Sequence, residues 1–184
     1  MLTLEDVAPG VQMIRARAGP AKCANSYLVG YDSPVMFEPV LFGNEGADWL
    51  DLFVRWSVDG RTASAVALTH EHIDHCREAE GLAAFAGAVF RPDALPGWER
   101  IPSPGHAPEH VSFWSPSTGV LVAGDMISSL GPVLMPKNGD LGAYRDSARR
   151  LLDLHADLVL PGHGEPMRGR IAREAMLAAS ERQA

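Results

Sequence analysis

The chain has 184 residues and a formal net charge of −7, with 46% hydrophobic and 21% charged residues. This is the composition of an ordinary globular protein, and the length suits one domain with a sizeable core. The acidic balance and the lack of any run of Lys or Arg argue against a nucleic-acid surface.

Signals for export or membrane insertion are absent from the sequence. The N-terminal residues lack the basic region and long apolar core of a signal peptide, and no apolar run is long enough to span a membrane. Two cysteines, Cys23 and Cys76, are too few for a disulfide framework. We therefore expect a cytoplasmic protein with free thiols and no membrane partner.

The N-terminal third predicts a meander of short strands over residues 11–15, 25–29 and 35–37, separated by turn-forming residues such as Gly19-Pro20. The connection 15–24 carries three cations. We interpret it as a solvated basic loop and leave open a role as a flap.

A helix is predicted over residues 44–60. Its apolar positions recur at i, i+3, i+4 and i+7, which places Trp49, Leu52, Phe53 and Trp56 on one buried face. The apolar run 65–68 that follows predicts a buried strand.

A cluster of metal-binding residue types follows this strand directly, in the pattern His-x-His-x-Asp-His at residues 70–75. In an extended chain, His70 and His72 point to the same side, because side chains repeat every two residues. Asp74 and His75, which we expect in the turn, can face a second point. Burying so many polar groups without partners is costly, so the pattern indicates that one strand end supplies ligands to two metal ions.

The remaining elements are read from apolar periodicity, turn residues and a predicted helix cap at Asp140. They are a helix over 77–87, strands over 88–91, 100–101, 111–114 and 120–122, an irregular segment over 126–138, a helix from 140 to about 156, a strand over 158–160, and a helix from 170 onward.

Three further candidate ligands stand in turns at or near strand ends. His106 closes Ser103-Pro104-Gly105-His106, Asp125 follows Gly124, and His163 lies in Pro161-Gly162-His163-Gly164. We expect the adjacent glycines to allow sharp turns and to leave room for ions. A set of imidazoles and carboxylates suits Zn, Mn or Fe(II).

With these four motifs, the sequence resembles the metallo-β-lactamase-fold metallo-hydrolases over roughly residues 25–166, in the branch similar to hydroxyacylglutathione hydrolases rather than the true β-lactamases. The resemblance implies a single domain over residues 1–184, of class α/β (α+β): a four-layer αββα sandwich of two mixed β-sheets flanked by helices. It also implies two divalent metal ions, zinc being favoured and Mn or Fe left open. The implied ligands are His70, His72 and His106 for the first metal, Asp74, His75 and His163 for the second, and Asp125 as a bridge.

The resemblance implies a dinuclear metal-dependent hydrolase of a small-molecule ester, thioester or lactone. A metal-bridging hydroxide would be the nucleophile, with Asp74 and Asp125 as the catalytic carboxylates. Three alternatives stay open: a phosphodiesterase or ribonuclease with the same site, an iron-dependent sulfur dioxygenase, and a non-catalytic metal-binding module.

The sequence departs from the family pattern at a few positions. Glu38 stands where several members have an Asp-x-Gly turn, so it is either support for a ligand His or an ordinary turn residue. Cys76 replaces a common Gly, and we interpret it as a buried inert thiol rather than a ligand. His110 is expected to orient His106 or a ligand carboxylate. Asp125 stands where one group of true β-lactamases has a Cys, which favours the general hydrolase branch.

Substrate contacts cannot be assigned from the sequence. The apolar loop 127–137 is a candidate wall, with core packing or a subunit contact as the alternative. Tyr144 is interpreted as a packing residue rather than an oxyanion donor, and His155 as a structural residue on a helix. Lys137 and Arg15 are candidates for binding a substrate carboxylate, and a homodimer is left open.

Overall fold

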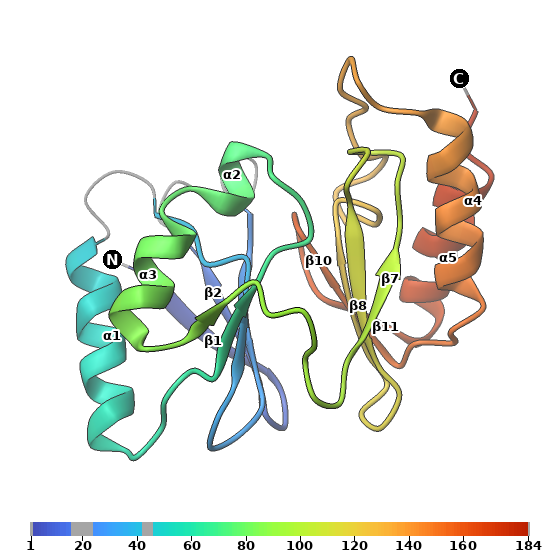
Figure 1. Ribbon diagram of the computed structural model, residues 1–184. Coiled ribbons are helices and arrows are strands. Elements are labelled where there is room, and N and C mark those ends of the chain that lie inside the picture. The colour runs from blue at the N-terminus through green and yellow to red at the C-terminus, as the bar shows by residue number, and fades with distance from the viewer. Residues whose placement is uncertain (1, 16–23, 42–45, 184) are drawn as a thin grey trace. The chain divides into compact units, whose positions relative to one another are not determined.

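The computed structural model describes residues 2–15, 24–41 and 46–183. The chain divides into two compact units (Figure 1). Unit 1 comprises Met1–Leu68 and His72–Ala94, and unit 2 comprises Thr69–Glu71 and Leu95–Ala184. Each unit has its own mixed sheet and helices. Most of the predicted loop 15–24 lies outside the described residues.

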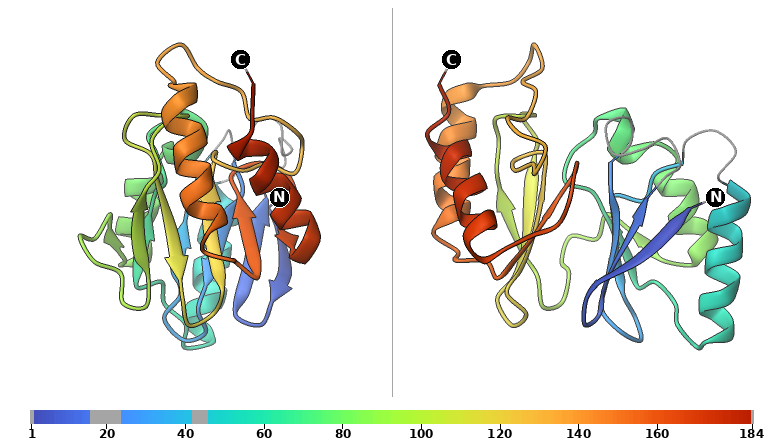
Figure 2. Two further views of the ribbon diagram at one scale, coloured as in Figure 1. Left: turned by 90° about the vertical axis from the view of Figure 1, so that its right-hand side faces the viewer. Right: turned by 180° about the vertical axis from the view of Figure 1, so that it is seen from behind.

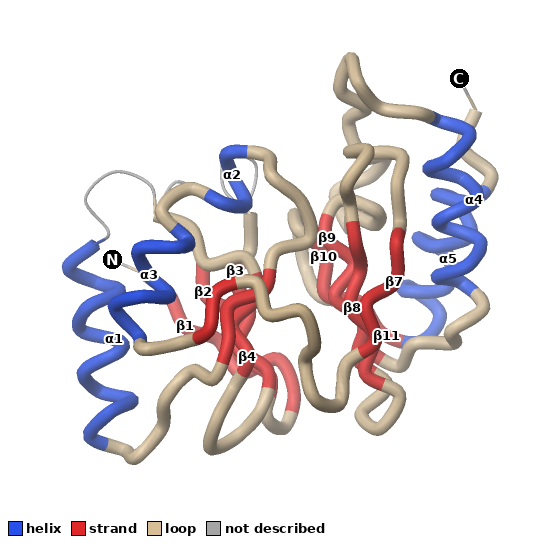
Figure 3. Tube along the Cα trace, in the orientation of Figure 1, coloured by secondary structure: helices blue, strands red, loops and turns tan. Residues whose placement is uncertain are grey.

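Unit 1 contains a six-stranded sheet in which the strands follow one another in chain order (Figure 3). The first four strands pair antiparallel, whereas β4 with β5 and β5 with β6 are parallel. A parallel pair needs a crossover connection, and helix α1 (Gly46–Val58) provides it between β4 and β5. The strands are β1 (Thr3–Ala8), β2 (Val11–Arg15), β3 (Ser26–Val29), β4 (Val35–Phe37), β5 (Ala65–Ala67) and β6 (Val89–Phe90).

The core of unit 1 lies where α1 and α3 (Ala79–Ala86) pack on the sheet (Figure 1). The predicted face of α1 is confirmed, because its four large apolar residues are all buried. The rings of Trp49 and Phe53 lie 5.6 Å apart in this core, next to Met36 and Val66 of the sheet. Each such side chain contributes about 1.5–3 kcal/mol on burial.

Unit 2 contains a five-stranded sheet in the order β11-β10-β9-β8-β7. Only β9 with β10 is parallel, and helix α4 (Leu141–Leu152) lies in the connection between them. Helices α4 and α5 (Gly169–Ser180) lie side by side over the sheet (Figure 2). The strands are β7 (Glu99–Pro102), β8 (Val111–Ser115), β9 (Val120–Gly124), β10 (Leu158–Pro161) and β11 (Met167–Arg168).

Helix α4 begins where predicted and ends earlier than predicted. Asp140 caps it, its Oδ1 accepting a hydrogen bond from Ala143 N at 2.9 Å. The predicted end near residue 156 is wrong, because the chain leaves the helix after Leu152 and His155 adopts a left-handed φ of 52° before β10. His155 is therefore an exposed residue of a turn, not of a helix.

The stretch after β5 also differs from the prediction. Asp74 and His75 lie in a short helix, α2 (Ile73–Cys76), rather than in a turn. The predicted helix 77–87 begins only at Ala79, because Glu78 has a left-handed φ of 61° that separates α2 from α3. Strands β1 and β11 were not predicted.

None of the helices in the described part of the chain is long and apolar enough to cross a membrane.

Candidate metal centre

The described residues contain candidate metal-binding groups made of His, Asp and Glu side chains. In unit 2 these residues are His70, His106 and His163, and in unit 1 they are His72, Asp74, His75 and Glu38. Asp125, also in unit 2, lies beside two of them.

The segment Thr69–Glu71 belongs with unit 2 because of its backbone contacts. Thr69 O accepts a hydrogen bond from Val111 N, at the start of β8, at 2.8 Å. Glu71 N donates to the carboxylate of Glu109 at 3.2 Å. These contacts hold His70, which is 1% exposed, against the strand that follows the His106 turn.

Asp125 is the centre of the unit 2 group. Its Oδ2 lies 3.4 Å from His106 Nε2 and 3.6 Å from His163 Nε2. Both distances exceed an ordinary hydrogen bond. They match the separation of about 3.4 Å between two ligands of a tetrahedral ion with bonds of about 2.0–2.1 Å. The donor types and their spacing therefore fit a divalent cation beside Asp125.

The Nδ1 atoms of two unit 2 histidines, His106 and His70, have partners. His106 Nδ1 donates to the carbonyl of Leu134 at 3.0 Å. Because a carbonyl only accepts, Nδ1 carries a proton, and Nε2 is the nitrogen that faces Asp125. Thr69 Oγ1 lies 2.9 Å from His70 Nδ1, so the second nitrogen of that ring is also engaged. Metal-binding histidines usually have such a partner on the second nitrogen.

His110 packs within the unit 2 group rather than binding a carboxylate through Nδ1. That nitrogen lies 2.8 Å from Ser103 Oγ, which in turn is 2.9 Å from Ser112 Oγ. The ring centroid of His110 is 5.0 Å from that of His70 and 6.5 Å from that of His106. His110 therefore supports His70 more closely than His106.

Two motif glycines, Gly105 and Gly124, pack closely against protein atoms. A Cβ on Gly105, which has a φ of +141°, would lie 2.2 Å from the Cα of Tyr144. A Cβ on Gly124 would lie 2.4 Å from Thr69 Oγ1 and 2.7 Å from His110 Nε2. These two glycines let the ligand turns pack directly against their supporting residues.

The unit 1 group is built on Glu38 and helix α2. The Glu38 carboxylate contacts His75 Nδ1, and both residues are fully buried. His75 Nε2 then faces Asp74, whose Oδ2 is 3.8 Å away. A carboxylate on the far nitrogen is the usual support of a metal-binding imidazole.

Glu38 is held in a backbone conformation that non-glycine residues rarely adopt, with φ at 53°. Ser26 Oγ donates to Glu38 O at 2.6 Å, and Glu38 N donates to Ala67 O at 3.1 Å. Such strain persists only where the surroundings impose it, and it clusters at functional sites.

Other candidate residues have different environments. Tyr144 is a packing residue, as interpreted: it is 1% exposed, its hydroxyl donates to Met126 O at 2.7 Å, and burial raises its pKa to about 12. Cys76 is half-buried rather than fully buried, and Lys137 is exposed.

The sequence reasoning missed Thr69, although a hydroxyl residue next to the first motif His was a visible signal. It also missed the Leu134 carbonyl, for which the sequence carries no signal.

The sequence profile described as the metallo-beta-lactamase superfamily matches residues 23–91 and 87–163. The chain belongs to the metallo-beta-lactamase superfamily. The matched ranges include every ligand that the four motifs predict.

Two superfamily relatives are longer than this chain. "Probable metallo-hydrolase YqjP" of Bacillus subtilis is 34% identical over 116 residues, which are 58% of this chain and 33% of that protein. "Lactamase-like protein adaB" of Aspergillus niger is 27% identical over 162 residues, 76% of this chain and 49% of that protein. The chain thus spans about half or less of the curated relatives that it matches.

A solved superfamily structure shows the fold. The beta-lactamase domain protein from Burkholderia ambifaria matches with a TM-score of 0.74 at 21% identity, covering 97% of this chain and 75% of that chain. At this identity the likeness concerns the fold alone. It confirms the predicted α/β class, with two mixed β-sheets flanked by helices.

Proposed function

We propose that this chain is a dinuclear metal-dependent hydrolase that cleaves a small-molecule ester, thioester or lactone. Membership of a superfamily that includes metallo-hydrolases supports the reaction class. The proposed ligands are His70, His72 and His106 for one ion, Asp74, His75 and His163 for the other, and Asp125 shared by both.

One observation carries the proposal. A single carboxylate oxygen, Asp125 Oδ2, lies at ligand spacing from the Nε2 atoms of two histidines, His106 and His163. These histidines come from turns that precede β8 and follow β10. A carboxylate that shares its charge between two such imidazoles has the role expected of a bridge in a two-metal site.

The residues of the chain prepare the site for this chemistry. A bound pair of divalent ions, with zinc favoured, would lower the pKa of a shared water toward about 7 and stabilise the developing oxyanion. The Leu134 carbonyl and the Glu38 carboxylate engage Nδ1 of His106 and His75, so Nε2 is the nitrogen left for a metal. The side chain of Asp74 is 31% exposed, and we propose that its carboxylate orients the attacking water.

Metal content is the first test. Protein purified without chelator should carry about two zinc or manganese ions per chain by inductively coupled plasma mass spectrometry. Asp125→Ala should lose metal and hydrolysis together. Asp146→Asn, an exposed α4 residue paired with Arg149, is the matched control and should keep both.

Substrate class is tested on the loaded protein with panels of thioesters, lactones and phosphodiesters. Turnover of a thioester or lactone supports the proposal. Hydrolysis by metal-free Asp125→Ala protein would overturn it. About one iron per chain, with oxygen consumption on persulfides, would instead support the dioxygenase alternative.

A further inference from the structure

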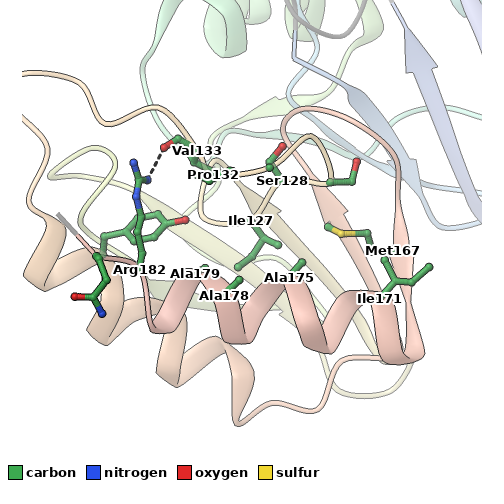
Figure 4. Close-up of a pocket in the computed structure, with 14 residues that line it drawn as sticks. Ile127, Ser128, Pro132, Val133, Met167, Ile171, Ala175, Ala178, Ala179 and Arg182 are labelled. Carbon is green, nitrogen blue, oxygen red and sulfur yellow. Dashed lines mark hydrogen bonds between the residues drawn. The ribbon is translucent and has the colours of Figure 1, made fainter.

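Unit 2 contains a cavity of about 630 Å³ between the loop that follows Asp125 and helix α5 (Figure 4). Small-molecule sites typically have volumes of about 300–1,000 Å³. None of the proposed metal ligands lines this cavity. It is therefore a separate candidate site.

The cavity exists because α5 presents small side chains to the loop. Ala175, Ala178 and Ala179 face the loop residues Ile127 and Val133 across it (Figure 4). The methyl groups of these alanines are too small to fill the gap between the helix and the loop, so an apolar cavity remains along α5.

The hydroxyl groups of the cavity wall already contact protein. Ser128 Oγ donates to His163 O at 3.2 Å and accepts from Leu130 N at 3.1 Å. Ser129 Oγ accepts from Glu165 N at 2.6 Å, and the Tyr144 hydroxyl donates to Met126 O. The cavity thus offers an apolar interior with few polar groups directed at a ligand.

Arg182 is the exception, at one end of the cavity. The guanidinium lies 5.6 Å from the centre of the Tyr144 ring, and Nη1 donates to Val133 O. A guanidinium has five N–H donors, so this bond leaves several available. Within the described residues no Asp or Glu forms an ion pair with Arg182. A half-buried cation in this position favours an anionic ligand group.

The opposite end of the cavity is apolar. Met167 and Ile171 lie there, away from Arg182 (Figure 4). At 1.5 Å per residue, α5 extends about 13.5 Å from Ile171 to its end at Ser180, enough for an extended chain of about ten carbons.

We infer that this cavity binds a single-chain apolar carboxylate, a molecule of the fatty-acid type. Its carboxylate pairs with Arg182, and its chain runs along α5 past Ala175 toward Met167 and Ile171. The apolar walls of the cavity contact the chain of the ligand, and the Arg182 guanidinium favours a negatively charged head group over a positively charged one.

The test is isothermal titration calorimetry of the metal-loaded protein with decanoate below its micellar concentration. Decanoate should bind saturably, one per chain. Decyltrimethylammonium has the same chain and the opposite charge, and it should bind much more weakly. Arg182→Gln should weaken decanoate binding about tenfold or more. Arg173→Gln, an exposed residue of the same helix, is the matched control and should not.

Two further measurements separate this site from the metal centre. Ala175→Trp should fill the cavity and abolish decanoate binding while the circular dichroism spectrum stays that of the wild type. Decanoate binding should persist after chelation, because no proposed metal ligand contacts the cavity. Loss of binding on chelation, equal affinity for the two head groups, or unchanged affinity in Arg182→Gln would overturn the inference.

Discussion

At the scale of single residues, the candidate site depends on what holds each imidazole. His106 is held by a backbone carbonyl, His70 by a threonine hydroxyl and His75 by a buried carboxylate. All three contacts engage Nδ1. The consequence is that Nε2 is the nitrogen presented for a metal in each case.

Glu38→Gln tests the support of His75. The amide is nearly isosteric and can still contact Nδ1, but the negative charge that raises the basicity of the ring is lost. We expect metal affinity to fall about 10–100-fold with little change in fold. Competition with a chromophoric chelator measures this. Glu80→Gln, exposed on α3, should leave the affinity unchanged, and equal affinities for the two variants would contradict the role.

Gly105→Ala tests how tightly a ligand turn packs on α4. The new Cβ would meet the Tyr144 backbone at 2.2–2.3 Å, so the helix or the turn must move. We expect a loss of about 3 kcal/mol or more in the free energy of unfolding, from overpacking plus strain. Urea denaturation measures it.

Gly131→Ala is the matched control, because Gly131 also has a positive φ, at +116°, but a Cβ there meets nothing within 4 Å. It should cost only the conformational strain, about 1–2 kcal/mol. Equal losses in both variants would show that crowding at Gly105 does not matter.

At the scale of elements, sequence patterns predicted what depends on neighbours in the chain. The stripe through Trp49 and Trp56 predicted α1, and Asp140 predicted the start of α4. Strand β1 was missed because its residues are mostly exposed, so no apolar alternation marks it. Helix α2 was missed because one turn is too short to show a helical period.

The candidate site also combines features that depend on neighbours in the chain with features that depend on distant contacts. The sequence alone nominates the proposed ligands, because each stands in a short motif beside a strand end. The contact of Leu134 with His106 spans 28 positions and uses a backbone carbonyl, which any residue would provide. The space beside Gly105 and the cavity at Arg182 depend on which helix packs there, so no short sequence pattern predicts them.

Tyr144, in helix α4, makes the stability of the folded protein depend on pH in the alkaline range. Burial raises its pKa from 10.0 to about 12, because the folded state disfavours the charged phenolate. An unfolded chain releases this proton near pH 10, so the stabilisation is fully present below pH 10 and is lost as pH rises to about 12. The loss is about 3 kcal/mol, at roughly 1.4 kcal/mol per pH unit.

Urea denaturation at pH 9 and pH 11.5 measures this effect. Tyr144→Phe should reduce the alkaline loss of stability relative to the wild type. Tyr31→Phe, which changes a tyrosine that is 66% exposed, should not. The same alkaline loss in Tyr144→Phe as in the wild type would count against the assignment.

At the scale of the whole molecule, the proposed ligands are divided between the two compact units. His72, Asp74 and His75 belong to unit 1, whereas His70, His106, Asp125 and His163 belong to unit 2. The unit boundary thus falls inside the first motif, between Glu71 and His72. That residues 1–184 form a single domain stays a prediction. A homodimer, which the sequence leaves open, stays a prediction as well.

Metal removal should therefore lower the thermal stability of the whole chain. A ligand at 1,000 times its dissociation constant stabilises the folded state by about 4 kcal/mol, or about 10 °C in Tm for a chain of this size. Calorimetry with and without chelator measures the shift, and added zinc should reverse it. Chelator should have no effect on Asp125→Ala, and coincident melting curves of wild type with and without chelator would argue against a structural contribution of metal.

The outermost strand of unit 1 bears on how the chain behaves at high concentration. Strand β1 pairs on one side with β2, and most of its residues are exposed. An exposed sheet edge is a template for aggregation, in which further copies add strand by strand. Glu5 and Asp6 are neighbours on this edge. A second copy of β1 that paired with it, antiparallel or parallel in register, would bring its own carboxylates close to theirs. We therefore expect the two acids to disfavour fibril growth from this edge.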